Sequence, residues 1–319
     1  MQRRSKTLIN ILTDKLIFIG GLGRSGKSFL CPIVSSLKKT EMYIMNSQAE
    51  NIYYLNYLRM MSDDISNYFF KQIYNEKIYN LNIGRDLNRR KFDHSNIKKN
   101  KNYKIYLSRE KSFKEHDIKI KDIRNSKNHY PIMFHNILLK PNFIFNAFSN
   151  SKIIFIDRNP VDLIFSWHKK QYGSKFRTNP RNSTIAFEYK KRTYPFWCRG
   201  YEKEFDKLKN EYEKIIFLLD KLYVIQKKNY FKYKKKNTRK ILLLKYENLT
   251  ENTDFEIKKI EKFLNLKKSD FTAKEIKNQR GNRLKISSVF KKRREKIIKN
   301  ISDKFKKKLI KLEKLYSKG

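Results

Sequence analysis

Nine consecutive residues near the N-terminus combine glycine, hydroxyl and cationic side chains in a way that favours anion binding. The segment 20–28 reads Gly-Gly-Leu-Gly-Arg-Ser-Gly-Lys-Ser and holds four of the nine glycines in the chain. It follows a short apolar run at 15–19 and precedes a helical apolar spacing at 28–37. Glycines let backbone N–H groups approach a phosphate closely, and a helix N-terminus adds a favourable dipole. The expected phosphate ligands are Gly23, Arg24, Ser25, Gly26, Lys27 and Ser28.

Residues 21–28 also fit the nucleotide-binding loop pattern G-x-x-x-x-G-K-S, which does not identify the phosphate compound. An ATP-dependent kinase would use Asp157, the acid after an apolar run at 152–156, to hold magnesium. A second pair of side chains of types that suit an anion is Arg158, directly after the same strand, and Ser166, eight residues later on the next helix. Arginine offers a planar fork of donors and serine adds a neutral hydroxyl. The kinase interpretation leaves both residues without a role.

The residues around this second pair carry a family resemblance. Segment 153–167, Ile-Ile-Phe-Ile-Asp-Arg-Asn-Pro-Val-Asp-Leu-Ile-Phe-Ser-Trp, resembles the 3′-phosphate motif of sulfotransferases. In that motif a strand leads to Arg-Asn/Asp-Pro-x-Asp and then to Ser followed by an aromatic residue. The resemblance implies an enzyme that moves a sulfuryl group from 3′-phosphoadenosine 5′-phosphosulfate (PAPS) to an acceptor hydroxyl or amine. It also implies that Arg158 and Ser166 hold the 3′-phosphate of PAPS.

Two later segments are similar to the same family. Residues 241–249, Ile-Leu-Leu-Leu-Lys-Tyr-Glu-Asn-Leu, resemble its strand followed by Tyr-Glu-Asp/Asn-Leu, which implies that Tyr246 lies near the adenine. Gln279-Arg-Gly-Asn-Arg283 is a weaker match to a late basic and glycine-containing loop that closes over the 3′-phosphate in some members. That match adds Arg280 and Gly281 to the expected nucleotide contacts.

Sulfuryl transfer needs a cation beside the leaving group and a base for the acceptor. By resemblance, Arg24 takes the 5′-phosphosulfate, and Lys27, where the family usually has Thr, contacts the same phosphate as a second cation. His135 is the first candidate base, because it ends a strand 23 residues before Arg158 and histidine titrates near neutrality. The Lys that usually precedes this histidine by two residues is replaced by Met133. Glu50 is the rival base, since other branches use a glutamate just after the second strand.

The elements that must position these residues alternate between strands and helices. Apolar runs predict strands at 15–19, 42–45, 130–134, 152–156 and 240–244, and helical spacing predicts helices at 28–37, 161–170, 196–229, 256–264 and through the last forty residues. We therefore expect a three-layer α/β fold with a mostly parallel sheet, a phosphate loop flanked by helices, and a single domain over 1–319. Region 51–130 is predicted to be a variable insertion that binds the acceptor, with a plain solvated loop as the alternative.

The composition limits the partners of this protein. The formal net charge of +44 favours a polyanionic partner, but Lys is spread along the whole chain, so we attribute most of it to compositional bias. A non-enzymatic nucleic-acid-binding protein is a second alternative, although no helix-turn-helix, zinc or RNA-recognition signature is present. The two cysteines fit no metal pattern, and we expect no metal. Without a signal peptide or membrane-length apolar run, a cytoplasmic enzyme is expected. A carbohydrate, a lipid and a small alcohol all fit as acceptor, and His94, His116, His129 and His168 are expected at the surface.

Overall fold

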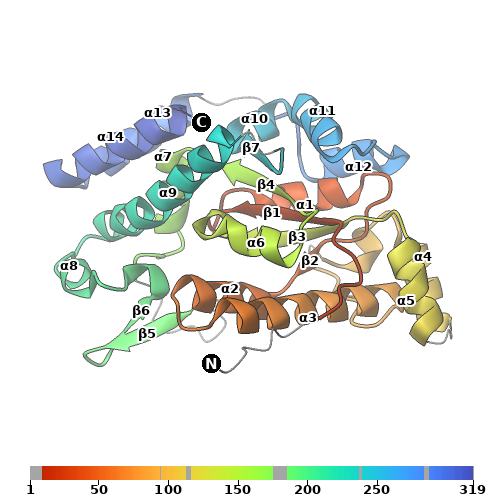
Figure 1. Ribbon diagram of the computed structural model, residues 1–319. Coiled ribbons are helices and arrows are strands. Elements are labelled where there is room, and N and C mark those ends of the chain that lie inside the picture. Colours follow the sequence, from red (N-terminus) through yellow and green to blue (C-terminus); the bar gives the residue numbers. More distant parts are fainter. Residues whose placement is uncertain are drawn as a thin grey trace, which may run out of the picture.

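A five-stranded parallel sheet forms the centre of the computed structural model, in the strand order β2-β3-β1-β4-β7 (Figure 1). Its strands are β1 Leu16–Gly21, β2 Ile44–Met45, β3 Tyr130–His135, β4 Lys152–Asp157 and β7 Ile241–Lys245. The central strand β1 pairs in parallel with β3 on one side and β4 on the other. The structure describes residues 9–93, 95–112, 116–174, 185–236, 239–283 and 287–318. The predicted parallel α/β fold is confirmed.

Two apolar clusters, one on each face of the sheet, produce the three layers. Leu16 and Phe18 of β1 belong to one cluster, whereas Ile17 and Ile19 belong to the other. Side chains of a strand point alternately to opposite faces, so a continuous apolar run is what a strand covered on both sides requires. All six residues of β1 are buried.

Helices cover both faces of the sheet. The face of Ile17 is covered by α1 Lys27–Ser35, α10 Tyr246–Glu251, α11 Thr253–Leu264 and α12 Asp270–Asn278. The face of Phe18 is covered by α2 Ser47–Tyr57, α3 Asp63–Asn82, α6 Pro141–Ala147, α7 Pro160–His168, α9 Glu211–Lys235, α13 Ser287–Lys299 and α14 Asp303–Ser317. Smaller elements on that side are η1 Ile97–Lys99, α4 Tyr103–Lys111, α5 His116–Asn125, η2 Ile137–Leu139, the hairpin β5 Ala186–Tyr189 and β6 Arg192–Pro195, η4 Phe196–Cys198 and α8 Glu202–Asp206.

Region 51–130 is mainly helical and contributes to the core. Phe70, Tyr74 and Ile78 lie one turn apart on α3 and are fully buried. The rings of Phe70 and Tyr74 pack on Phe18, the side chain at the centre of the sheet. This part of the region is therefore a covering layer and not a solvated loop. Its role in acceptor binding stays a prediction.

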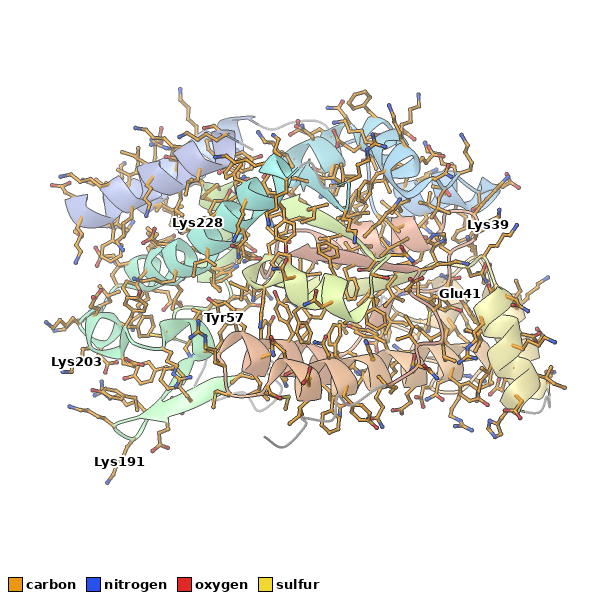
Figure 2. The ribbon with its side chains drawn as sticks, viewed as in Figure 1. Lys39, Glu41, Tyr57, Lys191, Lys203 and Lys228 are labelled. Atoms are coloured by element: carbon orange, nitrogen blue, oxygen red, sulfur yellow. The ribbon has the colours of Figure 1, made fainter. Side chains whose placement is uncertain are left out.

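A buried carboxylate fixes α4 to the sheet. Glu41 is fully buried just before β2, and Figure 2 shows it beside α4. Arg109 donates two hydrogen bonds to it, at 3.1 and 2.8 Å, and Tyr106 and Asn128 donate one each at 2.8 and 2.7 Å. Burial alone would raise the pKa of Glu41, but the hydrogen bonds and charge of Arg109 hold it below its usual value. The carboxylate therefore stays ionised inside the fold.

Replacing Arg109 should destabilise the protein strongly, because Glu41 would remain as a buried charge without its cation. We expect Arg109→Met to lower the free energy of unfolding by about 3–5 kcal/mol. Arg89→Met is the matched control, since Arg89 pairs with Glu110 at an exposed position and its loss should cost at most about 1 kcal/mol. Urea unfolding followed by circular dichroism measures both. Equal losses in the two variants would contradict the structural role of the Glu41 cluster.

Candidate active site

The predicted anion-binding residues meet at the carboxyl edge of the sheet. The glycine loop follows β1, while His135 ends β3, Arg158 follows β4 and Tyr246 follows β7. Parallel neighbouring strands bring these ends to one edge, which is where open α/β sheets bind ligands. The strand order therefore explains why residues so far apart in sequence converge.

The glycine loop leaves the N-terminus of α1 open. Gly26 is the N-cap of α1 with φ 109°, and no side chain caps the helix. The N–H of Phe29 donates back to the carbonyl oxygen of Gly26 at 3.0 Å, so the N–H groups at this helix end that suit an anion are those of the residues before Phe29. A Cβ atom at Gly26 would lie 2.3 Å from the ring of Tyr246, so the close packing of that ring requires glycine here.

Direct contacts join the loop to the segment after β4. Arg158 donates from Nη1 to the carbonyl oxygen of Arg24 at 2.6 Å, and Arg24 donates from Nε to Ser166 Oγ at 3.2 Å. The guanidinium of Arg158 also lies over the ring of Tyr246, 4.5 Å from its centroid. The structure thus brings together Arg24, Arg158, Ser166 and Tyr246 from three separate segments.

The start of α7 has a local explanation in the sequence. The Asn159 side chain accepts from the N–H of Val161 at 2.9 Å, and Pro160 occupies the first helical position, where it needs no donor. Glu247 accepts from the N–H of Asn159 at 3.1 Å. Asn and Pro after Arg158 therefore end the strand and begin the helix that carries Ser166.

Trp167 contacts the glycine loop, which the sequence analysis did not predict. Its Nε1 donates to the carbonyl oxygen of Gly23 at 2.8 Å, which ties the loop to α7. The aromatic position after Ser166 in the family motif was the available signal. A hydrogen bond across 144 positions of chain requires the folded structure to see it.

Lys27 points into the protein. It is buried, and its Nζ donates to the carbonyl oxygens of Gly21 at 3.1 Å and Leu22 at 2.7 Å. Burial lowers the pKa of Lys27 to about 8. Ser25 is also buried, with its hydroxyl toward Gly21, whereas Ser28 is exposed in the first turn of α1. Contacts of these three side chains with phosphate stay predictions.

His135 and Glu50, the two rival bases, form one pair. Glu50 Oε1 accepts from the backbone N–H of His135 at 2.8 Å and lies 3.0 Å from its Nδ1. Glu50 is buried in the first turn of α2, while the His135 side chain is 35% exposed. A carboxylate at Nδ1 favours the tautomer with the proton on Nδ1, which leaves Nε2 as the acceptor. The geometry suits histidine as base and glutamate as its orienting partner.

The late basic loop lies near the first turn of α1. Arg280 is exposed with φ 56°, and Gly281 lies close to Ile276. Arg283 extends to the first turn of α1, with its guanidinium carbon 5.7 Å from the ring centroid of Phe29. Residues 284–286 lie outside the described part of the chain. Nucleotide contacts by Arg280 and Gly281 stay predictions.

The carboxylate of Asp157 is bound by other side chains of the protein. Its carboxylate is buried and accepts from Lys227 Nζ at 2.7 Å and from the Tyr223 hydroxyl at 2.8 Å. Within the described ranges, no group of three His, Cys, Asp or Glu side chains could hold a metal ion. Both cysteines, Cys31 and Cys198, are free and buried.

The other described histidines lie away from these contacts. His116 contacts Tyr79 at an exposed position, and His168 stacks on Tyr212 with centroids 3.9 Å apart. His129 is half-buried, and burial lowers its pKa. His94 lies outside the described residues.

The fold and the site define a phosphate-binding α/β enzyme. Residues 14–316 match the family model of the sulfotransferase domain, so this chain belongs to the sulfotransferase family. It is an enzyme that transfers sulfuryl groups, with PAPS as the donor. No curated protein matches the sequence.

Several solved structures resemble the fold at low identity. The sulfotransferase domain from the curacin biosynthetic pathway is 13% identical with a TM-score of 0.42, and the match covers 80% of this chain and 75% of that one. A sulfotransferase from Alicyclobacillus acidocaldarius is 13% identical with a TM-score of 0.37, over 91% of this chain and 98% of that one. Retinol dehydratase in complex with androsterone and the inactive cofactor PAP is 13% identical with a TM-score of 0.35, over 84% of this chain and 64% of that one. Across the described ranges, every helix is too short or too polar to cross a membrane.

The lowered pKa of Lys27 predicts a pH-dependent affinity for the reaction product, 3′-phosphoadenosine 5′-phosphate (PAP). Lys27 loses its charge as the pH rises through about 8, and the positive potential under the loop falls with it. The phosphates of PAP have finished titrating by then, since a second phosphate pKa is about 6. We expect the affinity to fall several-fold between pH 7 and pH 9 in calorimetric titrations. Lys27→Met should bind more weakly at pH 7 and show a flat profile; a slope equal to wild type would contradict this assignment.

Proposed function

We propose that this sulfotransferase binds PAPS between the glycine loop and the start of α7, and transfers the sulfuryl group to an acceptor hydroxyl. The observation that carries the proposal is the chain of contacts Ser166–Arg24–Arg158, which joins the two predicted anion sites directly. One nucleotide with phosphates at both its 5′ and 3′ positions needs two such sites side by side. A single domain over residues 1–319 is part of this proposal.

The side chains present fit such a donor. Arg158 Nε is buried and has no hydrogen-bond partner among the described residues, so the guanidinium has donor capacity left. The uncapped N-terminus of α1 adds backbone N–H groups on the other side of the loop. We assign Arg158 and Ser166 to the 3′-phosphate, Arg24 and the loop 23–28 to the 5′-phosphosulfate, and Tyr246 to the adenine side.

His135 supplies the base in this proposal. Its Nε2 takes the proton of the acceptor hydroxyl while the acceptor oxygen forms a bond to sulfur and the bond from sulfur to the bridging phosphate oxygen breaks. The proton ends on His135 as an imidazolium, which Glu50 stabilises, and the negative charge ends on the released phosphate. Arg24 and the N-terminus of α1 stabilise that charge electrostatically. Bound PAPS supplies the sulfuryl group.

The two alternative functions lose their support in the site. The kinase interpretation needs Asp157 for magnesium, but Lys227 and Tyr223 occupy that carboxylate. The nucleic-acid interpretation rested on charge alone, and the family assignment accounts for the chain over 14–316. An amine acceptor and a cytoplasmic location stay predictions.

The 3′-phosphate assignment can be tested with two nucleotides. Wild type should bind PAP more tightly than ADP, which lacks the 3′-phosphate. Arg158→Ala should weaken PAP by at least about tenfold, since a hydrogen bond to a charged group contributes about 1.5–3 kcal/mol, and should weaken ADP less, because ADP loses only the support that Arg158 gives to the glycine loop. Arg85→Ala, at an exposed position after α3, is the control. Calorimetry measures all three proteins, and an equal preference for PAP in Arg158→Ala would refute the assignment.

The base assignment separates binding from turnover. His135→Ala should lower kcat for a simple hydroxyl probe, 2-naphthol, by about 10²–10⁴-fold, because general base catalysis contributes that much. Its affinity for PAP should stay within about twofold of wild type. Full activity in this variant would remove His135 as the base.

Glu50 should act through the histidine. Glu50→Gln removes the carboxylate that lies 3.0 Å from Nδ1 and orients the ring, so kcat for 2-naphthol should fall by about tenfold or more while the affinity for PAP stays within about twofold of wild type. Glu50→Asp should recover part of the activity. An unchanged kcat in Glu50→Gln would show that the pair is structural only.

A further inference from the structure

A cavity of about 420 Å³ lies beside the candidate site, outside the donor-binding residues. It is bounded by the end of α2, the turn η4 and one face of α9, and Figure 2 marks Tyr57 on its α2 side. Its lining residues are Tyr57, Leu58, Arg59, Phe196, Trp197, Arg199, Tyr201, Lys221, Leu222 and Ile225.

The walls of this cavity are aromatic and apolar. The rings of Phe196 and Trp197 meet edge to face with centroids 4.9 Å apart, and Tyr57 contacts Phe196 in the same manner at 6.3 Å. Leu222 and Ile225 complete the wall from α9. Such a surface favours a flat apolar ligand, since aromatic walls bury large areas and prefer stacked or edge-to-face contacts.

The lining of the cavity contains cationic side chains but no acidic ones. Arg59, Arg199 and Lys221 line it, no carboxylate does, and none of the three forms an ion pair within the described part of the chain. Lys221 lies over the ring of Tyr201, 3.3 Å from the centroid, which holds its ammonium at the wall. Arg59 adopts φ 59°, a left-handed conformation that directs the chain sharply after α2. An anionic group on the ligand would meet positive charge here.

One shared wall connects the cavity to the candidate base. The ring of Tyr54 packs on Phe196 with centroids 4.5 Å apart, and its hydroxyl donates to the carbonyl oxygen of His135 at 3.1 Å. From α9, Gln226 donates to the side chain of Asn136, the residue after His135, at 3.4 Å. Leu222, one turn before Gln226, faces the cavity. The cavity therefore adjoins the residues that hold His135.

We propose that this cavity anchors the acceptor, and that the acceptor is a hydroxylated aromatic or similarly flat apolar compound that carries an anionic group such as a carboxylate. The aromatic walls take the apolar body and Arg199 and Lys221 take the anion, with the hydroxyl directed to His135. The proposal rests on the function proposed above, since it uses His135 as the base.

The first test compares two probes that differ by one carboxylate, 6-hydroxy-2-naphthoate and 2-naphthol. Calorimetry with the PAP-bound protein should show that the carboxylate probe binds about tenfold more tightly, as one charged hydrogen bond provides. Arg199→Gln and Lys221→Met should each reduce that preference and leave 2-naphthol unchanged. Lys228→Met is the matched control, because Lys228 is exposed on α9 and does not line the cavity (Figure 2). Equal affinity of wild type for the two probes would overturn the proposal.

The second test blocks the cavity. Ile225→Trp places a large ring at the mouth, where the side chain is 38% exposed, so the fold should tolerate it. We expect its KM for 6-hydroxy-2-naphthoate to rise at least about tenfold while PAP affinity stays unchanged. An unchanged KM overturns the cavity as acceptor site.

Binding and turnover separate this inference from the proposed function. His135→Ala should keep the affinity for the carboxylate probe and lose its sulfonation. If that variant keeps full turnover, the base assignment fails while the cavity stands on the Ile225→Trp result. If wild type binds the probe in the cavity but does not sulfonate it, the acceptor proposal is wrong and the PAP site is untouched.

Discussion

The hydrogen bond from Arg158 to the carbonyl oxygen of Arg24 joins the two segments that the donor site depends on. It fixes the backbone of the glycine loop against the segment after β4, while the Arg24 side chain donates to Ser166 on α7. Tyr246 under Arg158 and Trp167 bonded to Gly23 hold the arrangement from both sides. These contacts hold two cationic side chains at the edge of the sheet where we propose that the donor binds.

Lys27 adds a third positive charge below the loop. Sulfotransferases usually have threonine at this position of the loop, and the contacts of Lys27 show how the longer side chain is accommodated. Its ammonium binds two carbonyl oxygens at the end of β1, so the hydrogen bonds offset part of the cost of burying the charge. The Lys27 ammonium thus both holds the loop conformation and supplies a charge that depends on pH. A threonine at this position would not supply such a charge.

The sheet, and the convergence of Arg24, Arg158 and Tyr246 at its edge, could be predicted from the sequence because both depend on local signals. Buried parallel strands read as continuous apolar runs, and the carboxyl ends of neighbouring strands must converge. The pairing of His135 with Glu50 could not be predicted, since it depends on how α2 packs across 85 positions of chain. The buried face of α3 was hard to recognise in the sequence because serine and asparagine share it with Phe70, Tyr74 and Ile78. The contact of Arg283 with Phe29 of α1 could not be predicted either, since the motif match does not say which side chain of the loop turns toward that helix.

Helix α9 links the donor side to the acceptor cavity. On one side Tyr223 and Lys227 bind Asp157, the last residue of β4 and the neighbour of Arg158. On the next face Leu222 and Ile225 line the cavity. Because the Asp157 contacts are buried and ionic, they fix the register of α9 against the sheet. They thereby also fix the position of the cavity wall that α9 supplies. Within the described residues, the opposite wall, from η4, makes no hydrogen bond to the glycine loop. Changes at η4 can therefore reshape the acceptor side while α9 keeps the donor side in place.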